Sequence, residues 1–245
     1  LVTSNGQRRA IRQAFKILKK YLAIIPARFC SKGIPFKNLL KIEGLSLVER
    51  AIKSAVNSKN NLDIVLSSDS EEILREANKY NDVIKHIRKP EHASDSATTA
   101  IVVKDIIHEI NKDYHEIIVL QPTSPFRTAD HIDHAINSLV MNPDCDGLVS
   151  VSKEEKDILK SFYINKNGYL KGTYSDEAPF APRQSLPDVY RANGAIFIVK
   201  TSIVKTKSKL YGVKMIPFEM DQSSSIDIDS IDDLKNLNYE LYVPK

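Results

Sequence analysis

The chain contains 245 residues, which is enough for one large domain but too few for two domains of ordinary size. Apolar residues make up 42% and charged residues 27%, so a disordered chain or a fibre is excluded, and no apolar run approaches the ~20 residues needed to span a bilayer. The formal net charge is +4, but residues 1–20 alone contribute +6, so the remainder carries −2 and is unlike a nucleic-acid-binding domain.

The cysteine content and the N-terminal region indicate the compartment and the domain boundary. Cys30 and Cys145 are the only cysteines of the sequence, too few for a disulfide framework or a cysteine metal cluster. We therefore expect a cytoplasmic protein with no membrane partner and no nucleic-acid partner. A basic N-terminal extension, residues 1–20, is expected to precede a single domain over residues 21–245.

From residue 21 to residue 151, short apolar runs alternate with segments of helical spacing. Strands are expected over residues 21–26, 62–66, 83–87, 116–120 and 148–151, and helices over residues 46–58, 70–80, 96–110 and 128–140. Repeated strand–helix–strand units form right-handed crossovers between parallel strands. The pattern therefore predicts an α/β fold with a mostly parallel sheet and helices on both faces.

The alternation stops between residues 152 and 190. Asn165 to Gly168 are typical of a hairpin turn, and three prolines over residues 179–187 argue against a long helix. We expect an inserted arm in this region. The remaining elements are expected to be two further parallel strands, over residues 195–199 and 213–216, and a closing helix over residues 230–241.

Parallel sheets bind ligands beyond the carboxyl ends of their strands, so the loops after residues 26, 66 and 120 are expected to carry the function. The first loop combines three cations with a hydroxyl and a carboxamide, namely Arg28, Ser31, Lys32, Lys37 and Asn38. Backbone N–H groups backed by Arg and Lys suit a polyphosphate. The loop matches neither a Walker motif nor a dinucleotide fingerprint.

Two shorter polar segments follow the next strands. Ser70 is expected to cap a helix, and the N-terminus of that helix favours the charge of Asp69. Two prolines should hold Gln121 and Thr123 rigidly at the mouth of a site. Arg127 could equally bind an anion or pair with a local carboxylate.

The last polar segments lie in the C-terminal quarter of the chain. Residues 183–197 could contact a substrate, while Gly194 could simply allow close packing. Asp227 and Asp229 lie two residues apart, so on a strand both carboxylates share a face, and a hard divalent cation would offset their repulsion. In the alternative interpretation Asp229 or its neighbour Ser230 only caps the final helix, which leaves Asp227 unexplained.

Together these segments resemble four motifs of the acylneuraminate cytidylyltransferases, also called CMP-sialic acid synthetases. The family's nucleotide loop, IPARGGSKGIPxKN, is similar to residues 25–38, and its QPTSPLR is similar to residues 121–127. Its RQxLPxxYRxNGAIY is similar to residues 183–197, and its SIDIDTxxDL is similar to residues 225–234. The motifs occur in the family's order, and the resemblance covers roughly residues 21–241.

The resemblance implies a Rossmann-like α/β fold, with an inserted dimerisation arm at about residues 152–190, that acts as a homodimer. It further implies that the protein uses CTP and Mg²⁺. CMP would be transferred to the anomeric hydroxyl of a nonulosonic acid, a nine-carbon 2-keto acid sugar, with release of pyrophosphate. Such a transfer depends on positioning and charge neutralisation more than on covalent help from the protein.

The family's functional positions fall on specific residues of this chain. The cations implied to be catalytic are Arg28, Lys32 and Lys37. The nucleotide would be bound by Arg28, Ser31, Lys32, Asn38, Arg88, Ser96 and Thr98. The acid sugar would be bound by Gln121, Lys160, Arg183, Gln184 and Asn193, with Lys160 and Arg183 reaching the neighbouring subunit's site from the arm. The Mg²⁺ ligands implied are Asp227 and Asp229.

Two departures from the family pattern affect these expectations. Phe29 and Cys30 replace two glycines, so the loop would be strained if it needs a positive φ there. Phe197 replaces a tyrosine on the sugar side. Which nonulosonic acid is used is therefore left open.

Three alternative functions stay open at this point. Activation of the eight-carbon acid sugar Kdo belongs to a sister branch, which typically has Ser-Thr-Arg where this chain has Ser31-Lys32-Gly33. The aspartates at 227 and 229 could be the DxD motif of a glycosyltransferase. A chain with an altered nucleotide loop could also bind a nucleotide without catalysis.

Overall fold

The computed structural model describes residues 20–31, 33–92, 97–235 and 237–244, so residues 1–19 of the predicted extension lie outside the described residues. The strands are β1 Tyr21–Pro26, β2 Lys41–Ile42, β3 Leu45–Ser46, β4 Leu62–Ser68, β5 Val83–Ile87, β6 Glu116–Val119, β7 Gly147–Glu154, β8 Phe162–Ile164, β9 Leu170–Gly172, β10 Val189–Lys200, β11 Met215–Glu219 and β12 Tyr239–Glu240. The α-helices are α2 Leu47–Val56, α3 Glu71–Arg75, α4 Thr99–Ile110, α5 Ala129–Met141 and α6 Thr201–Lys207. The 3₁₀ helices are η1 Lys37–Leu39, η2 Glu76–Lys79, η3 Pro90–His92, η4 Lys156–Lys160, η5 Ala178–Phe180, η6 Arg183–Ser185 and η7 Ile231–Leu234.

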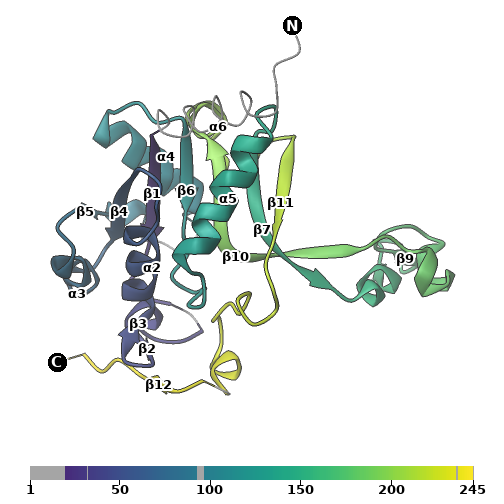
Figure 1. Ribbon diagram of the computed structural model, residues 1–245. Helices are drawn as coiled ribbons and strands as arrows, with labels where there is room; N and C mark the ends of the chain where they lie inside the picture. Colours follow the sequence, from purple (N-terminus) through teal and green to yellow (C-terminus); the bar gives the residue numbers. More distant parts are fainter. Residues whose placement is uncertain (1–19, 32, 93–96, 236, 245) are drawn as a thin grey trace, which may run out of the picture.

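In the part of the chain that the structure describes, seven strands form a central sheet in the order β11-β7-β10-β6-β1-β4-β5 (Figure 1). β1 pairs in parallel with β4 and β6, β4 pairs in parallel with β5, and β7 pairs in parallel with β11. β10 is antiparallel to both of its neighbours, β6 and β7. The predicted mostly parallel sheet is therefore confirmed, and β1 and β5 have the predicted boundaries.

The prediction of a parallel strand at residues 195–199 is wrong, because these residues belong to the antiparallel β10. The chain leaves β7 at its carboxyl end, forms the arm, and returns to the sheet at the same end (Figure 1). A strand that returns from that end without a crossover must run antiparallel. The other parallel strand expected after the arm is β11, which begins at Met215.

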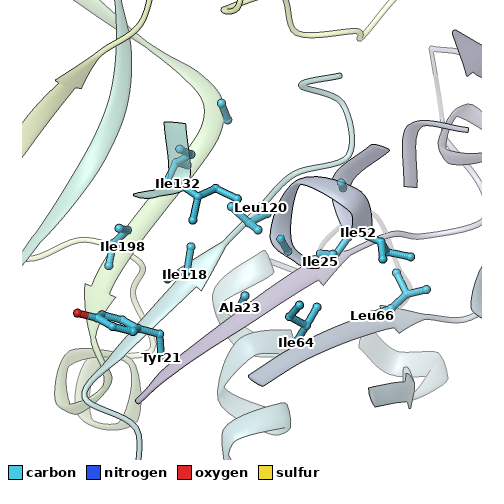
Figure 2. Packing of buried hydrophobic residues seen from close by; sticks show 14 of the residues in the cluster. Tyr21, Ala23, Ile25, Ile52, Ile64, Leu66, Ile118, Leu120, Ile132 and Ile198 are labelled. Atoms are coloured by element: carbon cyan, nitrogen blue, oxygen red, sulfur yellow. The ribbon is translucent and has the colours of Figure 1, made fainter. Parts of the chain in front are cut away.

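The core lies in two layers, one on each face of the sheet. On one face, Ala23 of β1 packs with residues that include Ile52 of α2 and Ile132 of α5 (Figure 2). On the other face, Leu22 of the same strand packs with Val103 of α4. Burial on both faces accounts for the continuous apolar sequence of β1, and helices on both faces are confirmed.

The arm is carried by the far halves of β7 and β10, which remain paired from Val151 and Ala192 outward (Figure 1). At its outer end, β8 and β9 form an antiparallel pair. The Oδ1 atom of Asn165 accepts hydrogen bonds from the N–H groups of Asn167 and Tyr169, at 2.9 and 3.1 Å. The predicted hairpin turn is thus confirmed.

Two predicted helix starts are confirmed and one is corrected. Thr128 Oγ1 accepts a hydrogen bond from His131 N at 3.3 Å at the start of α5, and Ser46 caps α2 in the same way. Ser70 precedes α3, but its hydroxyl donates to Glu72 Oε2 at 2.6 Å and makes no cap bond to the backbone. The predicted helix over residues 70–80 is divided between α3 and the 3₁₀ helix η2.

The predicted closing helix over residues 230–241 is wrong. Only the short η7 forms, and the chain then continues into β12, which pairs antiparallel with β2. This pairing, with Glu43 N donating to Asn238 O at 3.1 Å, overrides the helical spacing of the segment. Among the residues described, no helix is long and apolar enough to cross a membrane.

Candidate active site

A polar cavity of about 360 Å³ opens at the carboxyl ends of β1 and β5 and beside the chain beyond β6. Its walls come from five separate segments and consist of Pro26, Arg28, Ser31, Lys37, Asn38, Arg88, Ala97, Thr99, Gln121, Pro122, Thr123, Asp227 and Asp229. The location is the one predicted for ligands of a parallel sheet, and the volume lies within the range of small-molecule sites.

The loop after β1 is held at both ends. Asn38 is buried, and its Nδ2 donates to the carbonyl oxygen of Arg28 at 2.7 Å, which ties the end of the loop to its beginning. Phe29 N donates to Asp69 Oδ1 at 2.8 Å. The sequence predicts that the N-terminus of the following helix favours the charge of Asp69. In the structure its carboxylate also accepts the hydrogen bond from Phe29 and so fixes the loop after β1.

The replacement of two glycines in this loop causes no backbone strain. Neither Phe29 nor Cys30 has a positive φ. Among the described residues of the loop, Phe36 is left-handed, with a φ of 54°, and its ring packs against Phe29 at a centroid distance of 4.7 Å. The aromatic side chain at position 29 therefore stabilises the bend at Phe36.

Arg127 has a structural role that neither predicted alternative describes. Its side chain is buried, and Nη1 donates to the carbonyl oxygens of Gln121 and Ala195 at 2.8 and 2.9 Å. Burial lowers the pKa of Arg127 to about 9, which is still above neutral pH, so the guanidinium keeps its charge. Arg127 thus fixes the backbone at Gln121, whose side chain lines the cavity.

Asp227 and Asp229 both line the cavity, although their segment is an extended loop and not the expected strand. Ile228 between them is fully buried, and its N–H donates to Thr123 O at 2.8 Å. Lys37 Nζ lies 2.8 Å from Asp229 Oδ1. The alternation of an inward apolar residue with two outward carboxylates is therefore as predicted.

The capping interpretation of Asp229 is not supported by its contacts. Ser230 is the N-cap of η7, and its N–H donates to Asp233 Oδ2 at 2.7 Å. The side chain of Asp229 instead points to Lys37. Capping of the last turn thus falls to Ser230 and Asp233.

Two buried polar atoms of the cavity wall have no hydrogen-bond partner in the described part of the chain, Arg88 Nε and Asp227 Oδ1. Burial is the main cause that raises the pKa of Asp227, and the charge of Asp229 adds to it. A hydrogen bond from Thr123 and the charge of Lys37 act in the opposite direction. A buried carboxylate oxygen without a hydrogen-bond partner is suited to coordinate a cation, because leaving it unpaired lowers the stability of the fold.

The close packing expected as one interpretation of Gly194 is present in the structure. Its φ is 76°, and a Cβ there would lie 2.7 Å from Gln121 Oε1 and 3.3 Å from Asp227 Oδ2. Close packing explains the glycine, and the atoms packed on it belong to the cavity. Asn193 beside it does not line the cavity, and its Oδ1 accepts a hydrogen bond from Ser150 Oγ at 2.6 Å. The substrate contact of Asn193 therefore stays a prediction.

Several predicted site residues are not brought to this cavity. Lys160, Arg183 and Gln184 lie on the arm, where Arg183 pairs with Glu155. Thr98, just before α4, is exposed and does not line the cavity, whereas Ala97 and Thr99 on either side of it do. Lys32 and Ser96 lie outside the described residues.

We expect the substitution Gly33→Ala to destabilise the site. A Cβ at residue 33 would overlap the carbonyl oxygen of Asp229, so the loop after β1 and the aspartate segment would have to separate. The free energy of unfolding in urea should fall by about 1–3 kcal/mol. Ser31→Ala in the same loop is the control, because it adds no volume. Its free energy of unfolding should stay within about 0.5 kcal/mol of the wild-type value. Equal unfolding midpoints for Gly33→Ala and the wild type would contradict this close contact.

Comparison with known proteins supports the resemblance over almost the whole chain. Residues 22–243 match the family model described as cytidylyltransferase. The N-acylneuraminate cytidylyltransferase of Streptococcus agalactiae serotype V is 32% identical over 216 residues, which are 87% of this chain and 51% of that protein. The pseudaminic acid cytidylyltransferase of Campylobacter jejuni is 30% identical over 220 residues, which are 88% of this chain and 94% of that protein. The chain therefore spans about half the length of the streptococcal relatives and nearly all of the Campylobacter one.

Solved structures share the fold at low sequence identity. A CMP:2-keto-3-deoxy-manno-octonic acid synthetase complexed with CTP has a TM-score of 0.66 and 14% identity, covering 89% of this chain and 96% of that one. A 4-diphosphocytidyl-2C-methyl-D-erythritol synthase from Anaerococcus prevotii has a TM-score of 0.65 and 15% identity, covering 90% and 95%. Because the family model spans most of the sequence, and three of the four predicted motifs contribute residues to one cavity, the chain belongs to the cytidylyltransferase family.

Proposed function

We propose that this protein transfers CMP from CTP to the anomeric hydroxyl of a nonulosonic acid and releases pyrophosphate. The observation that carries the proposal is the cavity itself, which places the cations Arg28, Lys37 and Arg88 and the carboxylates of Asp227 and Asp229 around one space. Relatives named for sialic, pseudaminic and legionaminic acids support this substrate class.

The proposed nucleotide site lies along the loop after β1. Arg28, Lys37 and Lys32 of the same loop would neutralise the triphosphate, and Ser31 and Asn38 would complete that wall. Arg88 Nε offers a buried donor without a hydrogen-bond partner in the described part of the chain, and we assign it to the cytosine and ribose side, together with Ser96 and Thr98. In such a transfer the protein contributes mainly orientation and fixed positive charge near the α-phosphorus.

Asp227 and Asp229 would hold a Mg²⁺ ion, and the unpartnered Oδ1 of Asp227 supports this role. When bound, the ion would neutralise charge that develops on the phosphate oxygens. Lys37 contacts Asp229 directly, so it orients one ligand while its charge faces the same cavity. The chain thus offers three cations and two carboxylates around the space proposed for the triphosphate.

We further propose a homodimer in which each arm completes the partner's site. The arm carries many exposed apolar side chains, including Ile164, Tyr169 and Leu170 of the hairpin and Phe180, which is 81% exposed. Exposed apolar side chains gathered on one segment favour an association site there. A second copy of the chain would cover it and bring Lys160, Arg183 and Gln184 to the carboxylate of the acid sugar, which Gln121 and Asn193 would approach from the main sheet. A cytoplasmic location likewise stays a proposal.

A pyrophosphate-release assay tests the reaction. CTP with sialic, legionaminic or pseudaminic acid should give turnover with at least one of them, and CTP should exceed UTP, GTP and ATP. The eight-carbon Kdo acid is the control sugar. Equal turnover with another nucleotide would contradict the proposal, and binding of CTP without pyrophosphate release would favour a non-catalytic nucleotide binder.

The metal role predicts a large effect of removing either carboxylate charge. Asp227→Asn and Asp229→Asn should each lower turnover by about 10²-fold or more, because the ion stabilises charge in the transition state by several kcal/mol. The matched control is Asp232→Asn, which changes an exposed carboxylate of η7. Without metal, Asp227→Asn should melt no lower than the wild type, since it removes a buried negative charge that Asp229 repels. Near-normal turnover of both variants at low Mg²⁺ would return these residues to a structural role.

The shared site predicts complementation between subunits. Arg28→Ala and Arg183→Ala should each be inactive alone, but their heterodimer should regain up to about half of the wild-type sites, because one of its two sites has both arginines. A mixture of Arg28→Ala and Lys37→Ala chains is the control, since every site then lacks one loop cation. Verified Arg28→Ala/Arg183→Ala heterodimers without recovery would contradict the shared site.

A further inference from the structure

A second polar cluster lies beside the cavity, between β5, η3 and α4. It combines two imidazoles with two carboxylates. His86 Nε2 lies 3.2 Å from Glu109 Oε2, and His92 Nδ1 lies 3.3 Å from Asp105 Oδ2. Ligand atoms from His86, Asp105 and Glu109 all lie within 4.8 Å of one another.

Two atoms of this cluster are buried without a hydrogen bond. The side chain of His86 is only 7% exposed, and its Nε2 makes no hydrogen bond in the described part of the chain, although Glu109 Oε2 lies 3.2 Å away. Asp105 Oδ2 is likewise buried without a hydrogen-bond partner in the described part of the chain. Buried polar atoms normally find a partner, so this pair calls for an explanation.

A bound metal ion explains why His86, Asp105 and Glu109 meet. Ligands of tetrahedral zinc lie about 2.0–2.2 Å from the ion, so two of them lie about 3.3 Å apart, and neither points directly at the other. The separation of 3.2 Å between His86 Nε2 and Glu109 Oε2 is close to this value, and ligand atoms of the three residues lie within 4.8 Å of one another. His92 Nδ1 contacts Asp105 Oδ2 at 3.3 Å and would orient that carboxylate from outside the set.

The opposing interpretation is a network of ion pairs around Lys89. Its Nζ lies 2.7 Å from Asp105 Oδ1 and 3.5 Å from Glu109 Oε1. These are the carboxylate oxygens that do not face the imidazoles. Lys89 therefore accounts for one oxygen of each acid and leaves the two that face His86 and His92.

We infer that His86, Asp105 and Glu109 form a Zn²⁺ site distinct from the Asp227–Asp229 pair, with three protein ligands as in open zinc sites. An imidazole nitrogen with two carboxylates suits Zn²⁺, whereas Mg²⁺ prefers an all-oxygen set. The other ring nitrogen of His86 lies 3.0 Å from Ser67 Oγ, an outer contact that orients a histidine ligand.

The position of this site indicates what the ion would do. The carbonyl oxygen of Ser67 accepts hydrogen bonds from Ala27 N at 2.9 Å and from Arg88 Nη2 at 3.3 Å. Arg88, two residues after His86, lines the candidate active site. The ion would therefore join β5 and α4 and fix the wall that carries Arg88.

Zinc titration of the metal-free full chain, with a chromophoric chelator as competitor and Mg²⁺ in excess, tests the inference. The wild type should bind one Zn²⁺ per chain. His86→Gln and Glu109→Gln should weaken binding by at least about tenfold, the effect that even an outer-shell change produces. His108→Gln is the matched control, because it removes an exposed histidine from the same helix. A chain with Asp227→Asn and Asp229→Asn should still bind one Zn²⁺.

Melting curves give a second readout. Zn²⁺ should raise the melting temperature of the wild type and of His108→Gln, and should not raise that of Glu109→Gln. Glu109 is 43% exposed, so this variant should fold even if a change at His86 disturbs the core. Wild-type zinc affinity in both ligand variants, or no stoichiometric binding by the wild type, would overturn the site. The titration contains neither CTP nor a sugar, so its failure leaves the proposed transferase reaction untouched.

Discussion

The contact between the loop after β1 and the segment around Asp229 is the constraint on which the candidate site depends. Gly33 packs so closely on the Asp229 backbone that a Cβ would not fit, and Lys37 Nζ lies 2.8 Å from the Asp229 carboxylate. Beneath the contact, Ile228 and Ile34 lie in a small hydrophobic cluster of their own. Apolar burial therefore joins two segments almost 200 residues apart in sequence, and their charged side chains face one cavity.

This arrangement concentrates opposite charges without neutralising all of them. Lys37 and Asp229 are paired, whereas Asp227 Oδ1 and Arg88 Nε are buried without a hydrogen-bond partner. Unpaired buried polar atoms cost stability, and functional sites are where proteins tolerate that cost. The wall around Arg88 is in turn fixed through Ser67, which also contacts His86 of the proposed zinc cluster.

Local sequence predicted the features that depend on local physics. The boundaries of β1 follow from an apolar run buried on both faces, and the site position follows from where parallel strands end. The antiparallel direction of β10 and the strand β12 depend on partners distant in sequence, so periodicity could not show them. The clamp by Asp69 and the close packing at Gly194 likewise arise only when separate loops meet.

Hydrogen–deuterium exchange with and without CTP and Mg²⁺ tests the central claim most directly, because it reports which backbone segments meet at the nucleotide. The account predicts that CTP slows exchange together in residues 27–38 and 226–230 and at Arg88. The cavity lined by Arg50, Lys53 and Phe126, on another part of the surface, should be unaffected. Protection confined to that other cavity, or protection of the first loop without the aspartate segment, would contradict it.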